Sequence, residues 1–174
     1  RVDLLTDTGS ATCSILVRPW GFDLPRTPAF STAFGFSPSS VIGKHRELAP
    51  DSLDDAGLIR EYLHLLARFR VSVYSPFAGS VGGLGDDGAL RFDWTGFDSV
   101  TGALLDGTYF EDAPPATSFA VPRPPRDLSA DQVSEWYRSV EAHLREKEWL
   151  DRGFADVMDE PMRSEYPAVK AAAA

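Results

Sequence analysis

Two adjacent carboxylates, Asp159 and Glu160, stand just before Pro161 and close a short apolar run that begins at Phe154. The run is typical of a β-strand, and proline ends a strand because it has no N–H to donate to the ladder. Two carboxyl groups at contact distance cannot both ionise freely, so the pKa of one must rise. A protonated acid beside an ionised partner suits acid–base chemistry at neutral pH. The alternative, a solvated acidic turn, stays open.

Other patterns with chemical potential are weaker. A glycine-rich run over residues 79–88 lacks the Gly-Lys-Ser/Thr ending of a phosphate loop and opens no helix directly, so we interpret it as a flexible loop. Glu61 and His64 have the spacing of a di-iron ligand pair, but no second pair exists, and we interpret both as surface residues. His45 and His143 lack carboxylate or cysteine partners at ligand spacing. We therefore predict no metal and no cofactor.

Composition narrows the class of protein. The chain has 174 residues, 43% of them hydrophobic and 25% charged, which predicts one globular domain with a real core. A formal net charge of −9 and scattered Lys and Arg argue against nucleic acid as a partner. No stretch approaches the roughly 18 apolar residues that cross a bilayer. The single cysteine, Cys13, excludes an internal disulfide, and its apolar neighbours predict a buried side chain.

These residues need elements to position them, and apolar periodicity predicts four strands, each followed by a helix. The strands are expected at residues 31–36, 71–74, 117–121 and 154–159. The helices are expected from a Ser52–Asp55 capping box to Phe69, over residues 96–105, from a Ser129–Gln132 capping box to Leu144, and from residue 163 onward. Trp136 and Tyr137 lie on the stripe of the third helix and are expected in the core.

The first 25 residues differ from the rest. Residues 11–20 are typical of a strand, and Pro25 and Pro28 make an extended linker after it. A lone strand has no pairing partner. We therefore expect residues 1–25 to be the last strand and connector of an upstream β-domain, and the chain to be part of a longer protein.

Four strand–helix units in succession predict an α/β fold with a parallel sheet and crossover helices. Spacing alone does not separate an open doubly wound sheet from a barrel. A complete eight-stranded barrel takes roughly 250 residues. Residues 26–174 hold four units, half the number in such a barrel, and from spacing alone both folds stay open.

A set of short motifs occurs in order along the chain: LPRTP at 24–28, STAFG at 31–35, RVSVY at 70–74 and DEP at 159–161. The set resembles the start of the catalytic barrel of glycoside hydrolase family 123 and of its relatives, the bacterial domain of unknown function 4091. The resemblance covers residues 15 to 170 approximately. It implies a TIM-type barrel, truncated here after its fourth unit, with a β-sandwich before it.

The resemblance also implies an activity, the hydrolysis of β-linked N-acetylhexosaminides, with N-acetylgalactosaminide as the family's substrate. Glu160 would be the general acid/base, and Asp159 would hold and polarise the substrate's own acetamide, whose carbonyl attacks the anomeric carbon. Consecutive strand residues point to opposite faces. They are therefore a poor pair for flanking one bond at about 5–5.5 Å, as direct-displacement retaining enzymes require. They can serve when one acts on the leaving group and the other on the acetamide.

Tyr74 and Trp94 are candidate substrate contacts, because both fall near the end of the second predicted strand and aromatic rings stack on the C–H faces of sugars. The alternative is ordinary packing over the sheet end.

Two other functions remain open: a noncatalytic carbohydrate-binding or scaffolding barrel, and an inactive fragment. Open sheet edges in a half-barrel would favour self-association with another copy. The resemblance favours a secreted or extracytoplasmic bacterial location.

Overall fold

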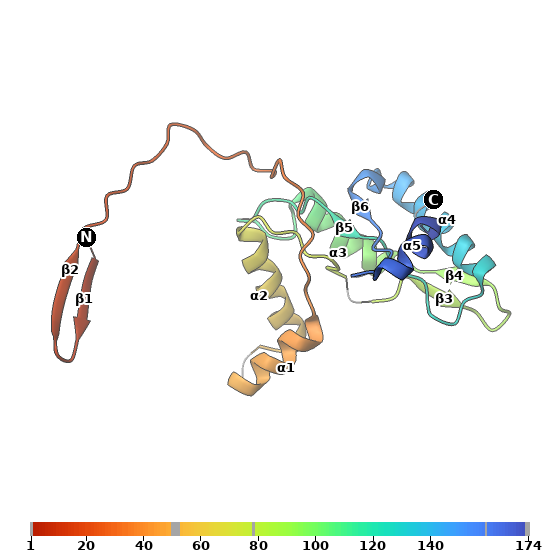
Figure 1. Cartoon of the computed structure of the whole chain (residues 1–174), viewed down its shortest axis with the longest axis horizontal. Helices are drawn as coiled ribbons and strands as arrows, with labels where there is room; N and C mark the ends of the chain where they lie inside the picture. Colours follow the sequence, from red (N-terminus) through yellow and green to blue (C-terminus); the bar gives the residue numbers. More distant parts are fainter. Residues whose placement is uncertain (1, 50–52, 78, 159, 173–174) are drawn as a thin grey trace.

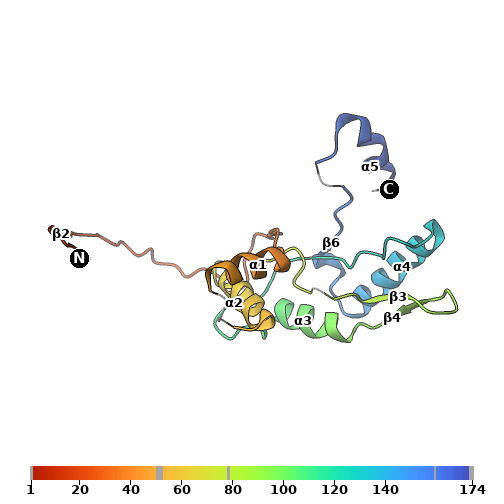
Figure 2. The same cartoon turned by 90° about the horizontal axis from the view of Figure 1, so that it is seen from below.

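The structure is a computed structural model that describes residues 2–49, 53–77, 79–158 and 160–172. An N-terminal hairpin stands apart from the body, and an extended stretch of chain from residue 14 onward connects the two (Figure 1). The body carries the helices and the short strands. The final helix, α5 (Tyr166–Ala172), stands away from the rest at the end of a single connecting stretch (Figure 2).

The hairpin corrects the expectation for the first residues. Strands β1 (Val2–Thr6) and β2 (Gly9–Cys13) pair antiparallel around a two-residue turn, and every residue of both strands is exposed. The strand expected over residues 11–20 is therefore wrong beyond Cys13, and its partner precedes it in the chain. Cys13 is exposed, not buried, because the hairpin stands apart from the body (Figure 1).

Within the body, four chain segments lie side by side in sequence order: residues 31–36, 71–74, 117–121 and 153–156. We call this set the four-segment array. Phe34 and Val73 form a parallel bridge, and strands β5 (Phe119–Ala120) and β6 (Gly153–Phe154) pair in parallel. The Ala120 amide donates to the Tyr74 carbonyl at 2.8 Å and joins the second segment to the third. The outer edges of the array have no strand partner among the described residues.

Regular strands in the array are shorter than expected because side-chain hydroxyls take the place of part of the ladder. The Ser72 amide donates to Thr32 Oγ1 at 2.7 Å, and the Thr117 amide donates to Ser72 Oγ at 2.8 Å. The Thr32 amide in turn donates to Thr117 Oγ1 at 3.2 Å. Hydroxyls thus satisfy backbone donors at the amino ends of three segments, as buried N–H groups require.

Helices α2 (Asp55–Arg68), α3 (Thr95–Asp106) and α4 (Ala130–Glu146) connect successive segments, and α1 (Pro38–Leu48) precedes α2. Val73 and Phe119 point from the array toward these helices. Val73 packs in one buried cluster with Leu63 and Leu104, and Phe119 in another with Trp136. Phe34, the bridge partner of Val73, lies in the first segment at an outer edge of the array and is 58% exposed. The helices therefore cover one face of the array.

Several local expectations are confirmed. The Ser129–Gln132 capping box is present, and α4 begins directly after Ser129. The helix expected over residues 96–105 is α3, which ends at Gly107 in the left-handed conformation (φ 78°) typical of a C-terminal glycine. Trp136 is fully buried, and its indole N–H donates to the Pro122 carbonyl at 3.0 Å.

Other expectations are wrong. The N-terminal cap of α2 is Asp54, whose carboxylate accepts from the Gly57 amide at 2.7 Å. Aspartate is a preferred N-cap residue, because its side chain satisfies a backbone N–H of the first helical turn. Ser52, the other half of the expected box, lies outside the described residues. Tyr137 is 40% exposed, since it lies at the solvent edge of the stripe. The glycine-rich stretch includes β3 (Gly82–Leu84), which pairs antiparallel with β4 (Leu90–Phe92) just after the stretch.

The fourth predicted strand is also shorter than expected. β6 ends at Phe154, and residues 155–158 are extended without ladder partners among the described residues. The short 3-10 turns η1 (Leu150–Arg152) and η2 (Arg163–Glu165) bracket this stretch.

Candidate functional site

Three side chains meet where the second, third and fourth segments of the array end. The Tyr74 hydroxyl donates to Asp156 Oδ2 at 2.7 Å, and Arg123 Nη2 donates to the same carboxylate oxygen at 2.8 Å. Arg123 Nη2 also donates to the Tyr74 hydroxyl oxygen at 2.6 Å. We call Tyr74, Arg123 and Asp156 the polar triad. It lies at the carboxyl ends of parallel segments, where α/β proteins place their ligand sites.

Strand periodicity explains why these side chains meet. Tyr74 follows Ser72 by two positions and shares its face, opposite the buried Val73. Asp156 follows Phe154 by two, and the rings of Phe154 and Tyr74 pack edge to face with centroids 5.3 Å apart. Pro122 ends the pairing of the third segment, and Arg123 comes directly after it.

The triad is electrostatically balanced. Partial burial raises the pKa of the Tyr74 phenol above its usual value, and the hydrogen bond to Asp156 raises it further, although the Arg123 charge opposes both. Tyr74 therefore stays neutral and donates its proton to Asp156 at physiological pH. Arg123 and Asp156 form an ion pair whose side chains are 59% and 32% exposed, so the triad has no net charge and faces solvent.

A cleft of about 250 Å³ adjoins the triad. Arg123 lines it together with Ser75, Phe77 and the end of the third segment, Ala120 to Pro122. Phe77 packs against Phe97 of α3 with ring centroids 6.0 Å apart, which fixes the apolar wall of the cleft. The cleft therefore combines an aromatic wall with the guanidinium of the triad.

The two acids singled out in the sequence are farther along the same stretch. Asp159 lies outside the described residues. Glu160 is exposed, and no hydrogen bond or ion pair joins it to another described residue. Its φ of 45° is left-handed, an uncommon conformation for a residue other than glycine and one that costs free energy. The structure thus joins Tyr74 to a polar cluster but does not join Glu160 to it through a described contact.

Trp94 lies elsewhere. It is the N-terminal cap residue of α3, and its ring stacks on His143 of α4 with centroids 4.0 Å apart. It also stacks on Phe92 and packs against the buried cluster around Trp136. This placement matches the packing interpretation, and no described contact joins Trp94 to Tyr74.

His143 has a carboxylate partner that sequence spacing did not indicate. Its Nε2 lies 2.7 Å from Asp98 Oδ1, and Lys147 lies 2.9 Å from the other oxygen of that carboxylate. The lysine ammonium occupies the position that a cation would take. Within the described ranges, no group of three or more His, Cys, Asp or Glu has the geometry of a metal site.

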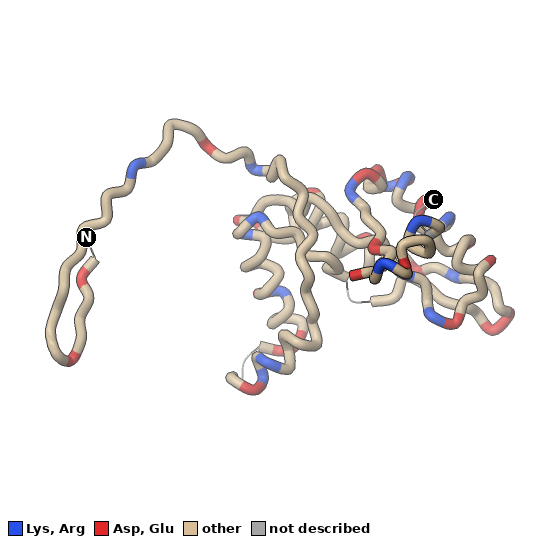
Figure 3. The backbone as a smooth tube through the Cα atoms, in the orientation of Figure 1, with Lys and Arg blue, Asp and Glu red and all other residues tan. Residues whose placement is uncertain are grey.

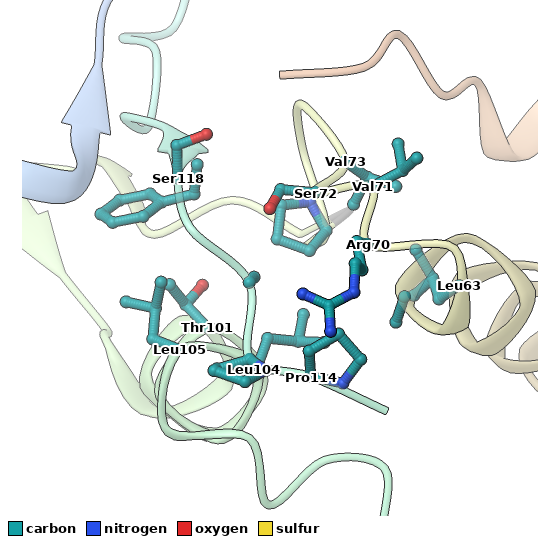
Figure 4. A pocket seen from close by; sticks show the side chains of 15 residues that line it. Leu63, Arg70, Val71, Ser72, Val73, Thr101, Leu104, Leu105, Pro114 and Ser118 are labelled. Atoms are coloured by element: carbon teal, nitrogen blue, oxygen red, sulfur yellow. The ribbon is translucent and has the colours of Figure 1, made fainter. Parts of the chain in front are cut away.

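A second, smaller cavity of about 30 Å³ lies between the array and helices α2 and α3 (Figure 4). Side chains of Leu63, Val73, Leu104 and Leu105 give it a mainly apolar lining. Its volume suits about one water molecule. It is therefore a packing cavity and not a substrate site.

Arg123 and Asp156 are the site residues that sequence reasoning missed. Arg123 stands two residues beyond the strand predicted at 117–121, Asp156 lies inside the strand predicted at 154–159, and Tyr74 ends the strand predicted at 71–74. The available signal was therefore their position at or near strand ends, and it was weak for Asp156. No protein-family model matches this chain, and no curated protein or solved structure is significantly similar to it.

The distribution of charged residues and the apolar character of the helices concern possible binding partners. Lys and Arg are interspersed with Asp and Glu over the body and do not gather on one element (Figure 3). No helix in the described part of the chain has the length and apolar character needed to cross a membrane.

Proposed function

We propose that the chain is the N-terminal half of a (β/α)8 barrel of the glycoside hydrolase type and that it contributes to hydrolysis of β-linked N-acetylhexosaminides. Glu160 protonates the glycosidic oxygen while the substrate's acetamide carbonyl attacks the anomeric carbon. Asp159 accepts the acetamide N–H and stabilises the cyclic oxazolinium that forms. Glu160, now ionised, then takes a proton from water as the water opens this intermediate.

The observation that carries the proposal is the order of the four segments. They run parallel in chain order, and a helix connects each to the next on one face. Polar side chains collect at their carboxyl ends, where barrel enzymes place catalytic groups. Glu160 follows Asp156 by four residues at this end. Its left-handed backbone is the kind of local strain that is found at functional sites.

The test is turnover of an aryl N-acetyl-β-galactosaminide by the intact protein that contains this chain. Glu160→Gln and Asp159→Asn should each lower kcat about 10²–10⁴-fold, the usual contribution of general acid–base catalysis. A substrate with N-trifluoroacetyl in place of N-acetyl should also react more slowly with the wild type. The fluorines make the amide carbonyl oxygen a weaker nucleophile toward the anomeric carbon.

Glu148→Gln is the matched control, because Glu148 is also an exposed glutamate with left-handed φ (60°). Its activity should equal that of the wild type. Unchanged turnover in both site variants would end the proposal of catalysis by these acids.

A noncatalytic carbohydrate-binding barrel is the second candidate. The polar triad favours it, since it forms an ordered cluster beside a cleft while Glu160 lines none of the cavities described above. Sugar binding without turnover at any pH would select this alternative, whereas an enzyme should show acidic and basic limbs in its pH–rate profile.

A further inference from the structure

The polar triad has unused hydrogen-bonding capacity. Asp156 accepts through Oδ2, and its Oδ1 makes no hydrogen bond to a described residue. Arg123 donates through Nη2, which leaves the donors on Nε and Nη1 without acceptors in the described part of the chain. The ion pair therefore presents an acceptor and several donors side by side.

This arrangement selects a class of ligand. A hydroxyl group both donates and accepts, so two neighbouring hydroxyls can donate to Asp156 and accept from Arg123 at once. Hydrogen bonds to charged groups are the stronger ones. Because Arg123 and Asp156 neutralise each other, a neutral polyol is favoured over an ion of either sign.

The surroundings limit the size and shape of that ligand. The adjoining cleft of about 250 Å³ is smaller than the roughly 300–1,000 Å³ of sites for drug-sized molecules. Phe77 provides an apolar wall against which the C–H face of a ring can pack. Tyr74 holds Asp156 in place from the side opposite the open oxygen.

We infer that Tyr74, Arg123 and Asp156, with the cleft beside them, form a subsite that binds adjacent hydroxyls of one neutral sugar ring. Arg123 and Asp156 contact the hydroxyls, and Tyr74 positions the carboxylate. The inference rests on the proposed function in that it specifies part of the same substrate site. It differs in that it concerns hydroxyl recognition and needs neither the acetamide group nor catalysis.

The experiment measures sugar binding by ligand-observed NMR and by isothermal titration calorimetry on the full chain. The probes are methyl β-galactoside and methyl β-glucoside, which have adjacent hydroxyls but no acetamide for Asp159 to hold. At least one should bind the wild type. Arg123→Gln and Asp156→Asn should each weaken that binding about tenfold or more, because each removes a charged hydrogen-bonding partner.

Arg91→Gln is the matched control, since Arg91 forms a comparable exposed ion pair with Asp87 at 2.8 Å but lies on β4. It should change affinity less than twofold. Glu160→Gln should also leave binding of these probes intact even where it abolishes turnover. Loss of turnover and loss of hydroxyl binding are thereby separated.

A second measurement does not depend on the folding of variants. In the ¹⁵N spectrum of the wild type, the Arg123 side-chain Nε–H resonance should shift on addition of the sugar that binds, and the Arg91 resonance should not. The inference is overturned if neither glycoside binds, if Arg123→Gln and Asp156→Asn bind as the wild type does, or if the Arg123 resonance stays fixed at saturation.

Discussion

Thr101 shows how a single buried atom affects the energetics of this fold. The residue lies in α3 and is 1% exposed, and its hydroxyl oxygen has no hydrogen-bond partner among the described residues. It borders the small cavity of Figure 4, where the neighbouring side chains are mainly apolar. Burying a hydroxyl without a partner costs free energy that valine, of nearly the same shape, does not incur.

We therefore predict that Thr101→Val raises the free energy of unfolding by about 1 kcal/mol and the Tm by about 2–4 °C. Thermal and urea denaturation measure both quantities. Thr108→Val is the control, because the Thr108 hydroxyl donates to Asp106 at 2.6 Å and its loss should not stabilise. A lower Tm for Thr101→Val would contradict the assignment and indicate that a water molecule in the cavity binds the hydroxyl.

At the scale of elements, Arg152 connects parts of the chain that lie far apart in sequence, a link that apolar periodicity does not predict. It lies in η1, and its Nη2 donates to the Leu105 carbonyl at 2.9 Å and to the Ala116 carbonyl. One guanidinium thus joins the last turn of α3, the start of the third segment and the turn before β6. Burial lowers the pKa of Arg152, yet an arginine stays charged at physiological pH.

Arg152→Met should lower the free energy of unfolding by about 2–3 kcal/mol, because the packing volume is kept while two carbonyls lose their donor. Urea denaturation monitored by tryptophan fluorescence measures the change. Arg145→Met should cost at most about 0.5 kcal/mol, since the ion pair of Arg145 in the described part of the chain is an exposed one, with Glu141 on α4. Equal effects of the two substitutions would show that Arg152 has no such connecting role.

The four expected helices were predictable because their signals are local, whereas α1 (Pro38–Leu48) was not expected from the sequence. The Ser129 box and the apolar spacing to Leu144 sufficed for α4, since both depend on residues within one helix. Strand lengths were not predictable, because they depend on partners far along the chain. Thr32 and Thr117 bind backbone groups of other segments through their hydroxyls and shorten the regular pairing.

The residues of the candidate site divide in the same way, into one with a local sequence signal and two that depend on distant contacts. Tyr74 was found because it ends a recognisable strand motif. Arg123 and Asp156 were missed, since their importance arises only when segments distant in sequence meet. The Asp159–Glu160 pair stays a prediction from sequence and resemblance.

At the scale of the whole molecule, the four-segment array has two open edges. In a parallel array alternate residues direct their N–H and C=O groups to opposite neighbours. Phe34 bonds inward to the second segment, so Ala33 and Gly35, both exposed, direct theirs outward. Ala155, also exposed, does the same at the far edge, where the Gly153 amide already donates to the Leu150 carbonyl. Unpaired edges of this kind are templates for pairing with another chain.

Pairing of the first edge of one copy with the last edge of a second would satisfy one edge of each copy, extend the parallel order and leave two edges open for further copies. We predict concentration-dependent dimers and larger oligomers of this chain in size-exclusion chromatography with light scattering. In a Cys13→Ser background, Gly35→Cys and Ala155→Cys chains should cross-link through a short bismaleimide when mixed, and each alone should do so much less. A monomer at every concentration, or equal cross-linking of the single variants, would exclude edge pairing.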